Sequence, residues 1–356
     1  MHAKAKMDMP RGIAYALASA VLFGLSTPVA KILVGSVSPL MLAGLLYAGS
    51  GVGLTLVIAA RQSTSRRASA IGMPRGRELA WLATAIVFGG VLAPVALMTG
   101  LASTAASSAS LLLNLEAVFT ALLAWFLFRE HFDRRIALGM LAIVAGGVVL
   151  AWSPGQGANF SGGVLFIVGA CLGWALDNNL TRKASGSDAL TIAALKGVIA
   201  GSVNLALALL LGQALPGAGV IAAAGVVGLM GYGVSLVLFV LALRHLGSAR
   251  TGAYFSIAPF VGALVAVLLA GEHVTWQLAA AGVLMALGVW LHVSERHEHE
   301  HAHEFLEHTH SHVHDEHHRH AHDEWDGHEP HTHRHVHEPL VHRHPHYPDL
   351  HHQHRH

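Results

Sequence analysis

The chain has 356 residues, of which 53% are hydrophobic and only 12% are charged. A water-soluble domain of this size needs far more charge, and a single cysteine, Cys171, excludes an internal disulfide or a thiolate metal cluster. The net charge of +1 hides an asymmetry, because residues 1–294 hold 17 Lys/Arg and 8 Asp/Glu whereas residues 295–356 hold 5 and 13. The chain is therefore expected to consist of two physically different parts.

Apolar blocks of roughly 20 residues recur through the first part, and that is the length of a helix that crosses a bilayer. Blocks this continuous do not alternate as barrel strands do, so each predicts a membrane-spanning helix. The ten predicted helices cover residues 12–32, 38–60, 79–100, 104–128, 135–152, 161–181, 189–211, 218–243, 247–270 and 276–293.

Basic residues orient these predicted helices. With the N-terminus in the cytoplasm, 15 of the 17 Lys/Arg of the first part lie before the first helix or in internal connections. The predicted outer loops near 101–104, 153–160, 212–217 and 271–275 contain none. The positive-inside rule thus predicts a multi-pass protein of the bacterial inner membrane with both termini in the cytoplasm.

A shift of 142 residues aligns the stretch 121–146 with 263–288, including Glu130 and His131 with Glu272 and His273. Each half then has five helices, and an odd number gives the halves opposite orientations. The expected fold is an all-α membrane protein of two inverted five-helix repeats. Its predicted parts are an N-terminus (1–11), a first repeat (12–152), a second repeat (161–293) and a tail (294–356).

Several diffuse motifs accompany this plan: Leu-Phe-Gly at 22–24 before Pro28, an apolar Ser-Ala run at 107–113, and the repeated acidic helix end at Glu130 and Glu272. With them the chain resembles the drug/metabolite transporter superfamily, specifically its EamA-type ten-helix permeases. The resemblance implies a secondary transporter. The family often has a Gly before the repeated Glu, and this chain has Gly271 but Arg129.

Polar side chains deep in predicted spans are costly and mark candidate transport pathways. The candidates are Asn114, Glu116, Asp177, Asn178, Asn179 and Lys196. Carboxylate and amide oxygens can coordinate a cation, and a buried carboxylate can exchange a proton. Two alternatives stay open: Lys196 neutralises Glu116 or Asp177 while the amides bridge helices, or an unpaired Lys196 favours an anionic or zwitterionic substrate.

Residues 297–356 hold 24 of the 29 histidines, many at alternate positions. Alternate spacing puts imidazoles on one side of an extended chain, and imidazole binds Ni²⁺, Co²⁺ and Zn²⁺. The tail is therefore predicted to be disordered and to bind a divalent transition metal, although a pH-sensing role or an incidental expansion stays open. The predicted ligands are His297, His299, His301, His303, His308, His310, His312, His314, His331, His333, His335 and His337.

The body plan and the histidine tail together are similar to membrane components of bacterial nickel and cobalt resistance systems. No phosphate-binding loop, Ser-His-Asp set or HExxH motif is found, so the sequence predicts no enzyme and no cofactor for transport.

The predicted function is secondary-active export of Ni²⁺ or Co²⁺, with Zn²⁺ or Cd²⁺ as further cargoes. The alternatives are an exporter of a small metabolite or amino acid and a membrane-tethered metal store. The expected partners are the lipid bilayer and metal ions, with a homodimer as an open option and no nucleic acid.

Overall fold

The computed structural model describes residues 2–64, 76–128, 134–152, 161–183 and 188–293, and four strands between residues 298 and 345. The chain divides into two compact units, a helical unit up to Glu295 and a tail from Arg296.

The helical unit is built from the apolar blocks that the sequence singles out. Its first half contains α1 (His2–Val34), α2 (Pro39–Thr64), α3 (Arg77–Ala85), η1 (Ile86–Leu92), α4 (Ala93–Ser103), α5 (Ala106–Leu112), α6 (Leu115–Phe128) and α7 (Arg134–Ala151). Its second half contains α8 (Gly162–Lys183), α9 (Ala189–Leu210), α10 (Ala218–Val227), η2 (Gly228–Val234), α11 (Ser235–Phe255), α12 (Ala258–Ala270) and α13 (Trp276–Val293).

In the described part of the chain, eight helical segments are long and apolar enough to cross a membrane, and two shorter apolar helices follow at Ala258–Ala270 and Trp276–Leu291. The eight long segments begin and end within a few residues of the first eight predicted spans. Hydropathy thus located the helices correctly. The ninth predicted span differs, because α11 continues through its start and α12 forms only its second part.

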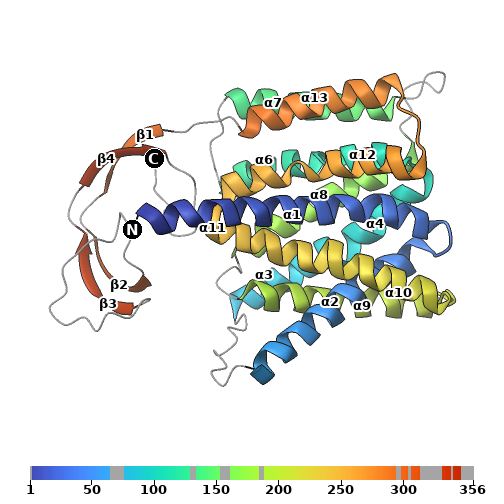
Figure 1. Ribbon diagram of the computed structural model, residues 1–356, viewed down its shortest axis with the longest axis horizontal. Helices are drawn as coiled ribbons and strands as arrows, with labels where there is room; N and C mark the ends of the chain where they lie inside the picture. Colours follow the sequence, from blue (N-terminus) through green and yellow to red (C-terminus); the bar gives the residue numbers. More distant parts are fainter. Residues whose placement is uncertain are drawn as a thin grey trace. The chain divides into compact units, whose positions relative to one another are not determined.

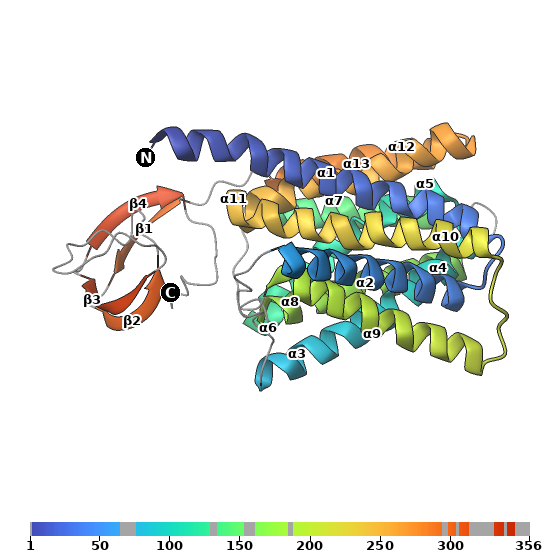
Figure 2. The ribbon, with the colours of Figure 1, turned by 60° about the horizontal axis from the view of Figure 1, so that its bottom comes forward.

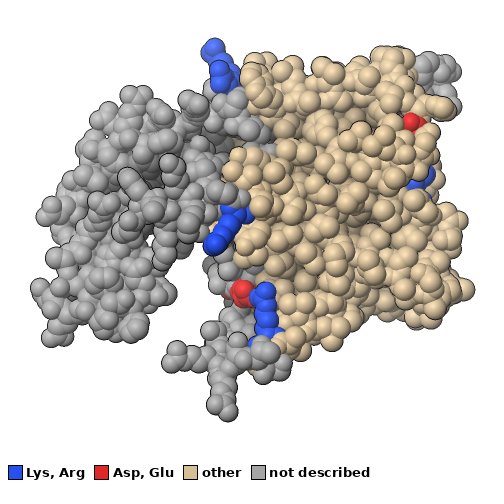
Figure 3. Space-filling model, in the orientation of Figure 1, with Lys and Arg blue, Asp and Glu red and all other residues tan. Residues whose placement is uncertain are grey.

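The surface of the helical unit is that of a membrane protein. Phe126 and Leu268 are each 70% exposed, and Val283 is 71% exposed. Figure 3 shows charged side chains at the two ends of this unit, with a broad uncharged band between them. An apolar band of this extent is covered by lipid rather than water, so the chain is a multi-pass membrane protein.

Helices from the two halves of the sequence pack against one another (Figures 1 and 2). The helix pairs between the halves include α1 with α11 and α12, α2 with α9, α4 and α6 with α8, α5 with α12, and α7 with α13. Small residues allow the close pairs: a side chain at Gly51 of α2 would overlap the backbone of Gly197 and Val198 in α9. Such backbone-to-backbone contact is a common way of joining helices in lipid.

Two kinds of irregularity recur at matching positions in the halves. The π-helical segments η1 and η2 begin at Ile86 and Gly228 and end at Leu92 and Val234, so they lie 142 residues apart. A two-residue interruption separates α5 from α6, and another separates α11 from α12, within one residue of the same spacing. The shift found in the sequence therefore also relates local backbone geometry.

The tail differs from the predicted disorder. It contains β1 (Glu298–His303), β2 (Leu306–His312), β3 (His331–His337) and β4 (Leu340–Pro345). β1 pairs antiparallel with β4, and β2 pairs antiparallel with β3. The physical reason is the period of two in these segments: the alternation of histidine with other residues that suggested an extended chain also suits paired strands.

Candidate functional site

Glu116 lies beside a break in the middle of a membrane span. Leu113 and Asn114 interrupt the helix, and the N–H groups of Glu116 and Ala117 bond only three residues back, to the carbonyls of Leu113 (3.1 Å) and Asn114 (3.2 Å). The Asn114 amide donates to the Leu111 carbonyl at 3.0 Å. Asn114 thus stabilises the break, and Glu116 occupies the first turn of α6.

The Glu116 carboxylate faces α8. Its Oε1 accepts a hydrogen bond of 2.8 Å from the Asn178 amide. This contact joins two predicted pathway residues from different halves of the chain. The partner is neutral, so the hydrogen bond leaves the negative charge of an ionised Glu116 uncompensated.

Asp177, the neighbour of Asn178, belongs to a closed set of three groups. Lys196 Nζ lies 2.5 Å from Asp177 Oδ1, and the two side chains are 11% and 12% exposed. Thr181 Oγ1 donates to the same oxygen at 2.8 Å and accepts from Lys196 at 2.8 Å. Of the two open alternatives for Lys196, the structure has the one in which it neutralises Asp177.

Sequence reasoning missed Thr181, although it lies one helical turn after Asp177 and that spacing places both on one face of α8.

The carbonyl of Gly89 in η1 accepts hydrogen bonds from two side chains close to these groups. Tyr47 donates to it at 2.9 Å and Trp174 at 3.0 Å. In η1 each carbonyl accepts a hydrogen bond from the N–H five residues later in the chain. The residue five after Gly89 is Pro94, which has no N–H to donate. The free carbonyl is thus satisfied by two aromatic side chains instead.

Gly89 also permits the approach of Asp177. A side chain at this position would overlap the Asp177 carboxyl group. The π-helical segment, its glycine and the ion pair therefore form one packed arrangement. Neither Tyr47 nor Trp174 was predicted, because nothing local in the sequence links residues so far apart to one carbonyl.

The remaining predicted pathway residue has a bridging role. The Asn179 amide donates to the carbonyls of Ala175 at 2.9 Å and of Thr120 in α6 at 3.3 Å. The structure thus brings Glu116 to Asn178 and Asp177 to Lys196, whereas the amides of Asn114 and Asn179 donate hydrogen bonds to backbone carbonyls.

Among the residues that the structure describes, no group of three or more His, Cys, Asp and Glu side chains lies close enough together to hold a metal ion. In the tail, His297 and His314 lie outside the described residues, and the other predicted ligands lie in β1, β2 and β3. The strand register there sets His308, His310 and His312 opposite His335, His333 and His331.

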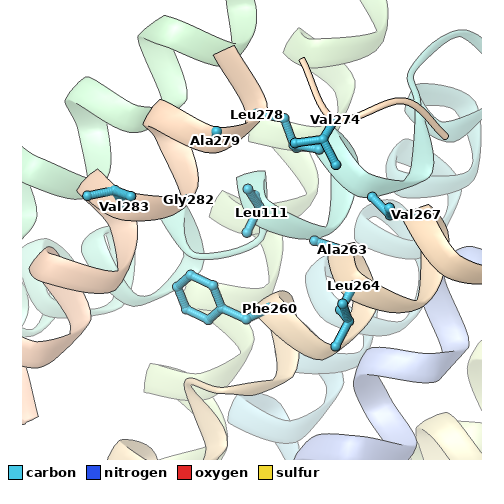
Figure 4. A pocket seen from close by; sticks show the side chains of 10 residues that line it. All are labelled: Leu111, Phe260, Ala263, Leu264, Val267, Val274, Leu278, Ala279, Gly282 and Val283. Carbon is cyan, nitrogen blue, oxygen red and sulfur yellow. The ribbon is translucent and has the colours of Figure 1, made fainter. Parts of the chain in front are cut away.

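An apolar groove of about 420 Å³ lies on the helical unit, between α12, α13 and Leu111 of α5 (Figure 4). Its walls carry no polar side chain; they are Leu111, Phe260, Ala263, Leu264, Val267, Val274, Leu278, Ala279, Gly282 and Val283. A groove of this composition suits an acyl chain rather than an ion, so it is separate from the polar site.

Comparison with known sequences decides the family of this helical unit. The profile of the EamA-like transporter family matches twice, at residues 10–152 and 161–294. The chain belongs to the EamA-like transporter family. This EamA protein is 28% identical over 293 residues to a protein of Methanothermobacter thermautotrophicus described as an uncharacterized transporter, covering 77% of this chain and 84% of that protein.

A solved structure described as "Crystal structure of protein" has a similar fold. It aligns with a TM-score of 0.58 and 18% identity, covering 78% of this chain and 95% of the other. At that identity the likeness concerns the fold alone. Together the comparisons show a membrane transporter of the EamA family, as the sequence motifs indicated.

Proposed function

We propose that this EamA transporter is a secondary-active exporter of divalent transition metal ions, Ni²⁺ or Co²⁺ first and Zn²⁺ or Cd²⁺ as further cargoes. It would lie in a bacterial inner membrane with both termini in the cytoplasm. The observation that carries the proposal is Glu116: a carboxylate at a helix break in mid-span, hydrogen-bonded to a neutral amide. An intramembrane carboxylate of this kind attracts a cation or a proton.

The packing of the two halves supports alternating access. A two-fold axis that relates inverted repeats allows two kinds of pair. In the first kind, a span packs against its own equivalent in the other half. In the second kind, two spans of one half each pack against the equivalent of the other. The observed pairs α2 with α9, α5 with α12 and α7 with α13 fit the first kind. The pairs α1 with α11 and α4 with α8 fit the second. We therefore propose that the halves are inverted repeats that rock about a shared site.

The state of Lys196 supports a cationic cargo. An unpaired ammonium would repel a divalent ion, but its 2.5 Å contact with Asp177 neutralises it. The pair then contributes no net charge, and Glu116 determines the sign of the net charge at the site. Because the described body residues offer no cluster of three ligands, an ion would pass as a partly hydrated species rather than rest in a tight site.

The tail supports the choice of a transition metal. It holds 24 histidines, and the register of β2 with β3 sets three of them opposite three others. Residues directly opposite in antiparallel strands have close Cβ atoms, so this register favours shared ions. The proposed role of the tail is to collect cytosolic metal before export.

The proposal is tested by metal accumulation in everted vesicles. Ni²⁺ or Co²⁺ should accumulate above the level of vesicles without the protein, and a protonophore should abolish the accumulation. Glu116→Gln should reduce it to background, whereas Glu78→Gln at the start of α3 should not. A truncation after Val293 should retain transport at high metal concentration and lose it at low concentration. Equal accumulation with and without the protein would contradict metal export.

A second candidate is export of a small amine or amino acid with the tail as a metal sensor or store. The observation that favours it is the single carboxylate and amide at Glu116 and Asn178, a pair that can bind a protonated amine. In that case metal accumulation is absent, and labelled amine uptake into the same vesicles depends on Glu116 but not on residues 295–356.

A further inference from the structure

The α4–α5 turn is held by two oppositely charged side chains from distant parts of the chain. Glu272 lies two residues after the end of α12, and its two oxygens accept hydrogen bonds from the backbone N–H groups of Ala106 at 2.7 Å and Ser107 at 2.9 Å. Lys31, near the end of α1, donates to the carbonyls of Leu101 at 2.5 Å and Ala102 at 3.4 Å. Both contacts lie at the end of the helical unit predicted to face outward.

Each charge meets the helix end that it complements. Ala106 and Ser107 are the first two residues of α5, where N–H groups lack partners within the helix and carry partial positive charge. Leu101 and Ala102 lie in the last turn of α4, where carbonyls carry partial negative charge. Both arrangements are therefore attractive, and the two charges also attract each other.

The backbone before Glu272 aims its side chain at this turn. Gly271 ends α12 with a φ of 64°, the left-handed region that suits glycine. Burial alone would raise the pKa of Glu272, but the hydrogen bonds from Ser107 and Ala106 and the charge of Lys31 outweigh it and hold the pKa below its usual value. Glu272 is thus ionised at neutral pH while it holds α5.

The two Glu272 contacts cross the boundary between the halves. Ala106 and Ser107 belong to the first half, whereas Glu272 belongs to the second. If the outward-facing path opens between α5 and α12, the two hydrogen bonds that Glu272 accepts must break, because they join the start of α5 to the residue that follows Gly271 at the end of α12.

We propose that Glu272 is a latch that holds the outward end of the transport path closed by binding the start of α5. Lys31 positions the turn that the latch engages. Such a latch acts on the equilibrium between the inward-open and outward-open states, whatever the cargo. If Glu272 only capped α5, its loss would lower the stability of the protein without changing which side of the transport path is open.

The single cysteine makes a direct test practicable. In a Cys171→Ser background, Ser110→Cys gives a reporter one turn below the latch, at a buried hydroxyl with no hydrogen-bond partner among the described residues. Thr120→Cys gives a second reporter on the other side of Glu116, also at a buried hydroxyl without such a partner. A membrane-impermeant maleimide is applied to whole cells for the first reporter and to everted vesicles for the second.

Glu272→Gln should raise the labelling rate of the Ser110→Cys reporter about tenfold and lower that of the Thr120→Cys reporter. Glu78→Gln, a glutamate away from the latch, should change neither rate. Unchanged labelling of both reporters overturns the proposal. Faster labelling of both also overturns it, because that result means a general loosening of the protein. Neither outcome touches the proposed function, which fails only if metal does not accumulate in vesicles.

Discussion

Lys196 and Asp177 form an ion pair 2.5 Å long inside a membrane span, with Thr181 bonded to both. The pair joins α8 and α9, the first two helices of the second half. Removing two opposite charges from water costs much of what their attraction returns, so such a pair specifies a geometry more than it adds stability. Its consequence here is local neutrality, which leaves Glu116 as the group that sets the charge of the site.

Removing one member of this pair should be far worse than removing both. Lys196→Met or Asp177→Asn leaves the other charge buried, and each should destabilise the protein by about 3–5 kcal/mol. The double variant should recover most of that loss. Thermal unfolding in detergent measures all three. Additive losses in the double variant would mean that the two side chains act independently.

The extent to which the sequence predicted this site follows from the range of each signal. Glu116, Asp177 and Lys196 were found because a charge in an apolar block is visible by itself. Their pairing was not decided, because the sequence offered two carboxylates for one ammonium. Hydropathy also located the spans but not η1, since a change from four-residue to five-residue bonding leaves an apolar block apolar. Tyr47 and Trp174 converge on Gly89 only after α2, η1 and α8 pack together.

That convergence predicts a non-additive loss. Tyr47→Phe or Trp174→Phe removes one donor from the Gly89 carbonyl and leaves the other, so each should cost little. The double variant leaves a buried carbonyl without a donor, which costs about 1–3 kcal/mol beyond the two single losses. A double-mutant cycle on thermal unfolding in detergent measures this excess. Two single losses that sum to the double loss would contradict the shared role.

The contact between Gly89 and Asp177 predicts a sensitive glycine. Gly89→Ala puts a methyl group into the Asp177 carboxyl group, so it should displace the ion pair and lower both thermal stability and transport. Gly169→Ala is the matched control, because a side chain there meets nothing within 4 Å in α8. The control should be neutral or stabilising by up to about 1 kcal/mol. Equal effects of the two substitutions would show that Asp177 does not need its close contact with Gly89.

The lowered pKa of Glu272 predicts how the latch responds to pH. A carboxyl group with a depressed pKa in the folded state stabilises that state above the unfolded value of 4.5, and this stabilisation is lost as the pH falls through the lower folded pKa. The ratio of Ser110→Cys labelling in Glu272→Gln to that in the parent should therefore be constant between about pH 6 and pH 8. A ratio that falls toward one at pH 6 would mean that Glu272 is already protonated there.

Metal binding by the whole chain should depend on the tail and on pH. Equilibrium dialysis of the detergent-solubilised protein with Ni²⁺ should give several bound ions per chain at neutral pH, and truncation after Val293 should remove most of them. Glu116→Gln should leave the number unchanged, because it acts on passage rather than storage. Imidazole must be neutral to bind an ion and has an ordinary pKa of about 6.5, so protons compete with metal as the pH falls. Binding should therefore weaken steeply between about pH 7.5 and pH 5.5. Metal retained by the truncated protein would place the ligands in the helical unit instead.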